Sequence, residues 1–187
     1  MHARTLSNPV DSPPIVQADF QQIHTHAQRI AQHVNLALSV VIPGNRDLKN
    51  LVAQLAWAGY LKDWSGPAEG ERPAAYIVVL GDTEVNNTFG CDHGIAAQSI
   101  LLGAAEMGIG GCFIGAIDKD RLQKALNIAP EFTILLVIAL GKPAETVVIE
   151  STANTGGNIR YWRDEHGGHH VPKRPISEVI LAAYPKE

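Results

Sequence analysis

Residues 92–115, DHGIAAQSILLGAAEMGIGGCFIG, decide the fold of this chain more than any other stretch. Apolar and small side chains dominate Asp92 to Met107, and their spacing predicts a helix that packs closely on its neighbours. Gly108 comes next, and glycine commonly ends a helix because it adopts the left-handed conformation without steric cost. The segment Gly108-Ile-Gly-Gly111 is therefore expected to end the helix and to lead into a loop.

Two largely apolar runs on either side of this helix predict buried strands. Tyr76 to Leu80 and Phe132 to Leu140 lack the alternation of a half-exposed strand, so both are expected to be covered on both faces. Gly141-Lys-Pro143 is expected to close the second strand. A short edge strand is expected at Val147 to Ile149.

The remaining elements follow from periodicity. Helical spacing predicts helices over 16–34 and 47–61 and a final short helix around 175–183. A further helix is predicted over 119–126, with Asp118 as its N-cap. β-Branched residues predict a strand over 38–42, and Gly and Pro predict a loop over 65–73. Residues 1–14 are expected to form an N-terminal arm. Without repeats or a linker, residues 1–187 are predicted to be a single domain, an α+β or α/β sandwich with one central sheet.

Composition excludes several classes of protein. Hydrophobic residues make up 45% and charged residues 18% of the 187, which argues against disorder. Fifteen Lys and Arg against nineteen Asp and Glu give a net charge of −4, so a nucleic-acid partner is not expected. No apolar run approaches the ~20 residues that span a bilayer, and no signal peptide is expected. Because Cys91 and Cys112 are too few for a disulfide framework, a soluble cytoplasmic protein is expected.

The glycine-rich segment Gly108 to Gly115 invites comparison with a dinucleotide-binding fingerprint. Such a fingerprint follows a strand and opens a helix, whereas these glycines follow a helix and Phe113 replaces the third glycine. The fingerprint is therefore rejected. A helix cap that feeds a loop is favoured, and close approach of the backbone to a flat ligand is the main alternative.

Three further groups could carry chemistry. They are the histidines 166, 169 and 170 beside Asp164 and Glu165, the run Cys91-Asp92-His93, and the pair Lys173-Arg174 between two prolines. The histidine spacing does not match a structural zinc site, so a solvated polar turn is favoured and no metal is expected. Neighbours in a turn rarely form a nucleophile and base, so no catalytic side chain is assigned there. The cation pair suits a phosphate, although adjacent surface cations are more often merely solvated.

Taken together, several motifs resemble the FMN-dependent nitroreductase family. They are Trp57-Ala-Gly-Tyr-Leu-Lys-Asp-Trp64, Gly66-Pro-Ala-Glu-Gly-Glu-Arg-Pro73, Asp92-His-Gly-Ile-Ala-Ala-Gln98, Gly108-Ile-Gly-Gly-Cys112, Ala139-Leu-Gly-Lys-Pro143, Tyr161-Trp-Arg-Asp164 and Val171-Pro-Lys-Arg174. They occur in the family's order and cover about residues 47 to 184. The resemblance implies an α-β-α sandwich around a central, mainly antiparallel sheet, in an intertwined homodimer that holds FMN at the subunit interface. It also implies an enzyme that passes hydride from NADH or NADPH through the flavin to a nitroaromatic, a quinone or a similar acceptor.

The resemblance also assigns roles to individual residues. Ile114, Gly115 and Ala116 fall on the loop whose backbone N–H groups approach flavin N5 and O4. Lys173 and Arg174 fall on the family's phosphate-binding pair. No catalytic side chain is implied, because the chemistry belongs to the flavin.

Asn35 falls on the asparagine that faces the flavin's pyrimidine edge. The family's N-terminal arginine-rich stretch falls on Ala3-Arg-Thr-Leu-Ser-Asn8, where only Arg4 and Thr5 match. This loss of cations keeps a second hypothesis open, in which the protein is a dimeric module that binds a flavin or a related planar ligand without efficient turnover.

Overall fold

The computed structural model describes residues 5–6, 21–23, 25, 27, 29, 37–43, 46–61, 64–180 and 182. Most of the expected N-terminal arm, Arg4 and Asn35 lie outside these residues. The chain forms two compact units: unit 1 is Met1–Gly59 with Asp63–Ala144, and unit 2 is Tyr60–Lys62 with Glu145–Glu187. Each unit is described by itself.

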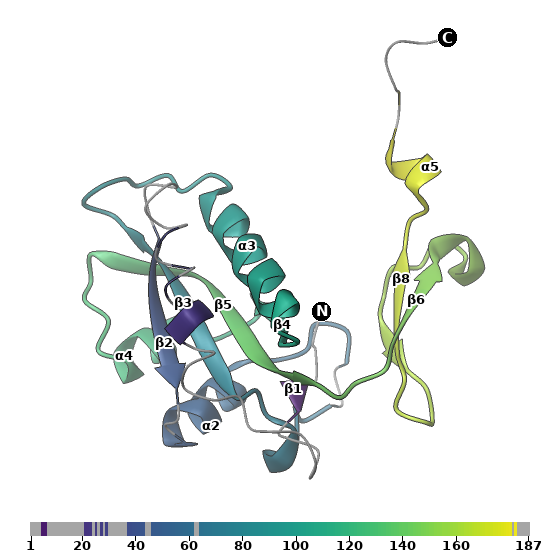
Figure 1. Cartoon of the computed structure of the whole chain (residues 1–187), viewed down its shortest axis with the longest axis horizontal. Helices are drawn as coiled ribbons and strands as arrows, with labels where there is room; N and C mark the ends of the chain where they lie inside the picture. The colour runs from purple at the N-terminus through teal and green to yellow at the C-terminus, as the bar shows by residue number, and fades with distance from the viewer. Residues whose placement is uncertain are drawn as a thin grey trace. The chain divides into compact units, whose positions relative to one another are not determined.

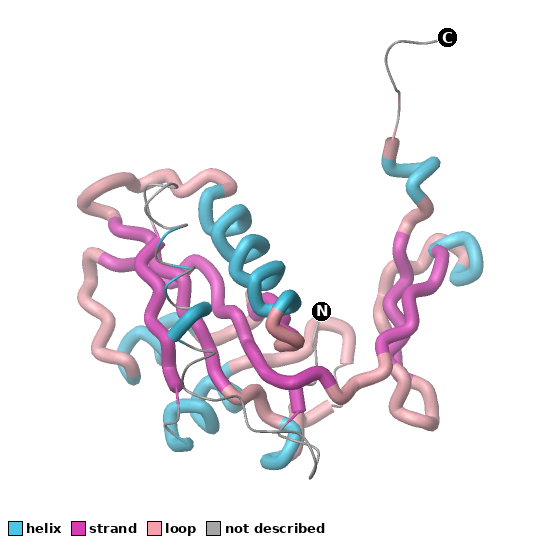
Figure 2. Tube along the Cα trace, in the orientation of Figure 1, coloured by secondary structure: helices cyan, strands magenta, loops and turns pink. Residues whose placement is uncertain are grey.

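Unit 1 is built on one antiparallel sheet of five strands (Figure 2). The strands are β1 (Thr5–Leu6), β2 (Ala37–Pro43), β3 (Ala75–Asp82), β4 (Gly110–Ile114) and β5 (Phe132–Pro143). Their order is β1-β5-β3-β2, and β4 also pairs with β5. The expected strands at 38–42, 76–80 and 132–140 are therefore confirmed, and so is a mainly antiparallel central sheet.

Helices cover both faces of this sheet because β3 is apolar on both faces. Tyr76 and Val78 point to the face that packs against α2 (Arg46–Leu55) and α4 (Lys119–Ala125). Ile77 and Val79 point to the opposite face, which packs against α3 (Asp92–Glu106) and the helical residues 23 and 27. Figure 1 shows α3 on one side of the sheet and α2 with α4 on the other. The sequence-based prediction of layered helices around a sheet is confirmed for these elements.

The end of α3 and the start of α4 follow the sequence signals. Gly108 has a left-handed φ of 70° just after α3, as expected of a glycine at a helix end. The Asp118 carboxylate accepts a hydrogen bond of 3.0 Å from the backbone N–H of Arg121, which makes it the N-cap of α4.

Three predicted boundaries in unit 1 are wrong. The helix expected over 47–61 ends at Leu55, because Ala56 forms a β-bridge with Ile117 and the Trp57 backbone N–H donates to the Ala116 carbonyl over 3.1 Å. The expected loop after Gly108 is instead strand β4. Strand β5 continues through Gly141 to Pro143, since Gly141 pairs with β4 and Pro143 pairs with β1. The expected loop over 65–73 contains one 3-10 turn, η1 (Glu69–Glu71).

Unit 2 is a three-stranded sheet with little helix. It contains β6 (Val147–Ser151), the 3-10 turn η2 (Thr152–Thr155), β7 (Trp162–Arg163), β8 (His169–Lys173) and α5 (Ile176–Val179). Strand β8 lies in the centre, parallel to β6 and antiparallel to β7. The edge strand expected at 147–149 is confirmed. Helix α5 is shorter than expected, because it starts at Ile176 and residues 180 and 182 are not helical.

Among the described residues, no helix combines the length and the hydropathy that crossing a bilayer requires.

Candidate functional site

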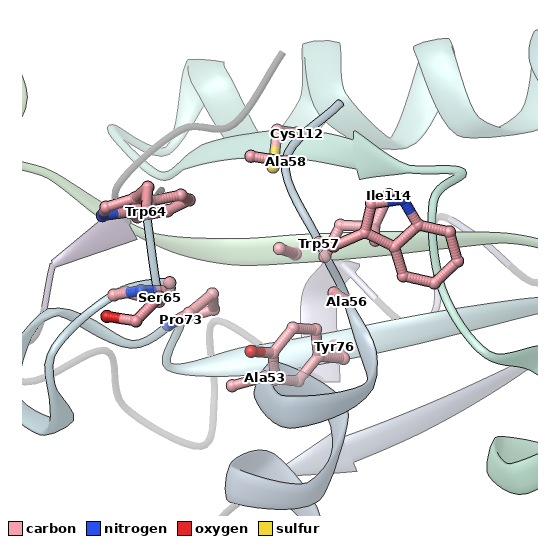
Figure 3. A pocket seen from close by; sticks show the side chains of 13 residues that line it. Ala53, Ala56, Trp57, Ala58, Trp64, Ser65, Pro73, Tyr76, Cys112 and Ile114 are labelled. Carbon is pink, nitrogen blue, oxygen red and sulfur yellow. The ribbon is translucent and has the colours of Figure 1, made fainter. Parts of the chain in front are cut away.

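Unit 1 contains a cavity of about 210 Å³ between the end of α2, the segment 64–67 and the sheet (Figure 3). Strands β3, β4 and β5 contribute Tyr76, Cys112, Ile114 and Ala139 to its wall. The other lining residues are Ala53, Ala56, Trp57, Ala58, Trp64, Ser65, Gly66, Pro67 and Pro73. Because α2 stops at Leu55, the chain from Ala56 to Ala58 runs along the cavity without helical structure.

The cavity wall is apolar and aromatic. The rings of Trp57 and Trp64 lie on opposite sides of it in Figure 3, and alanines 53, 56, 58 and 139 leave the space between. Such a wall, with few polar groups, is typical of a site for a flat, largely apolar ligand. Trp57 is 56% exposed, so one side of the cavity reaches the surface.

Tyr76 brings a hydroxyl group to this apolar wall. The residue is buried, and burial raises its pKa, with a smaller contribution from the Cys112 thiol nearby. The hydroxyl therefore keeps its proton at neutral pH, and it can serve as a hydrogen-bond donor rather than as a base.

The predicted flavin-contacting loop lies next to this cavity. Ile114 is the last residue of β4 and lines the cavity, and Gly115 and Ala116 follow it directly. The Gly115 carbonyl accepts from the Ile117 N–H over 3.2 Å, and the Ala116 carbonyl accepts from the Trp57 N–H. A Cβ atom at Gly115 would have no atom within 4 Å, so there is open space beside this turn. The structure therefore brings these three residues to the cavity, while their contact with a flavin stays a prediction.

The other predicted site residues are placed elsewhere. Lys173 ends β8, Arg174 follows it, and both side chains are exposed in unit 2. Thr5 pairs with Pro143 in β1, and its side chain lies outside what the structure describes, as do Arg4 and Asn35. The roles that the resemblance gives to these residues stay predictions.

The interpretation of the histidines as a solvated turn is correct for His166 only. Its side chain is 85% exposed, whereas the His169 side chain is 2% exposed on β8. The His169 Nδ1 atom lies 3.2 Å from Glu145, and the same buried carboxylate forms an ion pair with Arg163. Burial lowers the pKa of His169, although Glu145 acts in the opposite direction.

His170 is the other exception to the solvated-turn interpretation. Its side chain is 14% exposed, and each ring nitrogen meets a carboxylate, one from Glu150 and one from Asp164. Strands β7 and β8 were not predicted, because charged and polar residues take the place of the usual apolar run there. In the described part of the chain, no group of three or more His, Cys, Asp or Glu residues is arranged to hold a metal ion.

Neither cysteine forms a disulfide bond: Cys91 is exposed and Cys112 is buried in the cavity wall. Cys91 is the N-cap residue of α3, but its side chain makes no capping hydrogen bond. Cys112 is thus the cysteine that belongs to the candidate site, which the sequence analysis did not anticipate.

Comparison with known proteins agrees with this architecture. The family model described as "Nitroreductase family" matches residues 68–142. An FMN-dependent nitroreductase from Clostridium difficile R20291 superposes with a TM-score of 0.61 at 18% identity, over 78% of this chain and 84% of that one. An NADPH:FMN oxidoreductase from Vibrio harveyi, in complex with NAD+, gives a TM-score of 0.58 at 21% identity, over 78% and 66%.

A nitroreductase family protein from Clostridium difficile 630 covers all of this chain and 94% of its own, with a TM-score of 0.60 at 12% identity. No curated protein sequence matches. The predicted resemblance to the nitroreductase family is thus confirmed: residues 68–142 match the family model, and the chain has the nitroreductase fold.

Proposed function

We propose that this protein is an FMN-dependent oxidoreductase that passes hydride from NADH or NADPH to a nitroaromatic, a quinone or a similar acceptor. The observation that carries the proposal is the aromatic-walled cavity beside the turn at Ile114 to Ala116. Five of its lining residues lie within the segment that matches the family model: Pro73, Tyr76, Cys112, Ile114 and Ala139.

The residues present fit a flavin in two separate respects. A cavity of about 210 Å³ with apolar and aromatic walls suits part of an isoalloxazine ring. The phosphate requires cations, and Lys173 with Arg174 supplies two exposed ones, which form strong charge-assisted hydrogen bonds with phosphate oxygens. Arg4, Thr5 and Asn35 are assigned to the same cofactor by the resemblance alone.

When bound, FMN would supply the hydride chemistry, and the protein's part is placement and electrostatics. Trp57 and Trp64 would provide apolar, aromatic surface against the flavin ring. Tyr76 keeps its proton and offers a donor at the wall. The backbone N–H groups of Gly115 and Ala116 would approach the flavin ring, and the space beside Gly115 is open. No acid or base side chain is assigned to the reaction.

We also propose that the working form is a homodimer. The support is the resemblance, together with large apolar side chains that are exposed in the single chain, such as Ile149, Ile159 and Ile176. A second copy that covers such side chains would remove their apolar surface from water, which is favourable. Sedimentation that shows only monomers at micromolar concentration would contradict this part.

A second candidate is a flavin-binding module without efficient turnover. It is favoured by one observation, the loss of all but Arg4 from the family's N-terminal arginines. The two candidates differ in one measurement. Mixing FMN-loaded protein with NADH or NADPH without oxygen bleaches the flavin absorbance if the protein is an enzyme, and leaves it unchanged if it only binds.

The proposal that Lys173 and Arg174 bind the FMN phosphate is tested by variants. Replacing both Lys173 and Arg174 by Ala is expected to weaken FMN binding by at least about tenfold, since each charge-assisted hydrogen bond contributes about 1.5–3 kcal/mol. The matched control replaces Arg121 and Lys124, two exposed cations of α4, and is expected to leave the affinity unchanged. A protein that takes up no FMN, as purified or after its addition, would refute the proposed function.

A further inference from the structure

One face of the sheet in unit 2 carries a cluster centred on His170. Trp162 on β7 lies directly opposite His170 on β8. Glu150 lies two residues beyond Val148, the β6 partner of His170, and Asp164 lies two residues beyond Trp162. Because side chains two apart in a strand share a face, these four side chains meet on one face of the sheet.

The geometry of the cluster requires a charged ring. The Nδ1 atom of His170 lies 2.7 Å from Glu150 Oε1, and its Nε2 atom lies 3.0 Å from Asp164 Oδ2. A carboxylate oxygen can only accept a hydrogen bond, so both contacts are satisfied only when both ring nitrogens carry protons. The Trp162 ring stacks on the imidazole at 4.0 Å and an angle of 13°, a favourable position for a cation.

The charged groups around the ring agree with this state. Hydrogen bonds to Asp164 and to Glu150 raise the pKa of His170, and the bond to His170 lowers the pKa of Asp164. These two carboxylates are the charged groups that act on the pKa of His170, and the β7 residue that stacks on its ring is the uncharged Trp162.

The two carboxylates are not held equally firmly. The other oxygen of Asp164, Oδ1, accepts from the backbone N–H groups of Gly168 over 2.7 Å and of His166 over 2.9 Å. Glu150 lies on the edge strand β6, and His170 is its one hydrogen-bonding partner within the described residues. When His170 loses its proton, the contact with Glu150 is therefore the one that opens.

This contact lies close to the end of the β6–β8 ladder, since Glu150 precedes Ser151, the β6 partner of Lys173. The pairing of β6 with β8 runs from Val147 and His169 to Ser151 and Lys173, so Lys173 is held by the last pair of the ladder. We propose that the protonated ring of His170 ties β6 to β8 and so positions Lys173 and Arg174 for the flavin phosphate, which makes FMN binding weaken as the pH rises and the ring becomes neutral. The inference rests on the proposed function, because it takes these two cations as the phosphate site.

The test separates this effect from the titration of the phosphate. A phosphate monoester has a second pKa of about 6, so FMN itself gains charge as the pH rises, which favours binding. The dissociation constant of FMN is therefore measured by flavin fluorescence from pH 6 to 9, at fixed ionic strength, for the wild type and for His170→Gln. The glutamine side chain of this variant cannot become a cation, so the variant reports the titration of the phosphate alone.

The ratio of the wild-type dissociation constant of FMN to that of H170Q is expected to rise by about fivefold from pH 6 to 9. A factor of this size lies at the lower end of the affinity changes seen between energetically coupled sites. His166→Gln is the matched control, since that side chain is exposed on the neighbouring turn, and it is expected to follow the wild type. Riboflavin lacks the phosphate, so its dissociation constant is expected to be the same for the wild type and for H170Q at each pH.

A second variant keeps the test decisive if H170Q does not fold. Glu150→Gln removes one of the two charges that favour the imidazolium, so the pH at which FMN affinity falls is expected to move lower. The imidazole titration, followed by NMR without flavin, is expected to move in the same direction.

Identical pH profiles for the wild type and both variants, with FMN bound, would overturn this inference and leave the proposed function intact. A chain that binds no FMN at any pH would overturn the proposed function as well, and the two failures are thereby told apart.

Discussion

Replacing Gly111 by Ala tests how tightly β4 is packed in the sheet. A Cβ atom at this position would lie 2.7 Å from the Ala139 carbonyl oxygen, 2.5 Å from Leu101 Cδ2 and 2.9 Å from Leu140 Cδ2. The two leucine contacts can be relieved by side-chain rotation. The carbonyl cannot retreat easily, because Ala139 lies in the part of β5 that is paired with β3 on one edge and with β4 on the other.

The cost follows from that backbone contact. Overpacking of a well-packed core costs about 1–3 kcal/mol, and the upper part of this range, about 2–3 kcal/mol, is expected where backbone must move. In a protein of this size each kcal/mol lowers the melting temperature by about 2–4 °C, so Gly111→Ala is expected to lower it by about 4–12 °C.

Gly115→Ala is the matched control, because its Cβ would meet no atom within 4 Å and the residue does not have a positive φ. Its free energy of unfolding is expected to stay within about 0.5 kcal/mol of the wild type. Both variants are compared by thermal and urea unfolding followed by circular dichroism. Equal melting temperatures for the two variants would refute the packing of β4 against β5 described above.

Three further predictions concern the cap of α4 and the buried cluster of unit 2. Asp118→Ala removes the N-cap of α4 and is expected to cost about 1 kcal/mol in urea unfolding, whereas Asp120→Ala, inside the first turn, is expected to cost less. Glu145→Gln leaves the buried Arg163 guanidinium without its carboxylate and is expected to destabilise the protein by about 3–5 kcal/mol, while Glu165→Gln, with an 87% exposed side chain, is the neutral control. Burial lowers the pKa of His169 in the folded state, so folding favours the neutral imidazole. The stability that the neutral, buried His169 contributes is complete above its ordinary pKa of 6.5 and is lost as the pH falls through the lowered value. Hydrogen exchange of residues 169–173, corrected for the intrinsic rate, is therefore expected to become faster in acid, and an unchanged protection between pH 7 and 5 would contradict this.

The strands that could be predicted from the sequence are the apolar ones. Strands β3 and β5 lie between two helical layers, so they need apolar residues on both faces. Such a strand is recognisable in the sequence as a nearly continuous run of apolar residues. Strands β7 and β8 could not be found in this way. Their pairing is supported by the ion pair of Glu145 with Arg163, by the contact of His169 with the same carboxylate and by the stacking of Trp162 on His170. Glu145 is far from Arg163 and His169 in the chain.

The end of α2 shows a different limit. The helical spacing continues past Leu55, but Trp57 bonds to Ala116, about sixty residues away, and this contact overrides the local preference. The same contact explains why the cavity was not predicted. The family resemblance pointed to the turn at 114–116. Residues 56–58 also line the cavity, and only the tertiary structure reveals that they are not helical.

Strand β5 also has a consequence for how the chain is made. It provides the pairing edges for β1, β3 and β4, and the β1 pairing joins Thr5 to Pro143 across almost the whole of unit 1. On the ribosome, β2 and β3 can pair as soon as both have emerged. Strand β1 cannot pair with β5 until residues 132–143 leave the exit tunnel. Contacts of such long sequence separation are the slow ones to form, so β1 stays without its β5 partner while the intervening residues are synthesised.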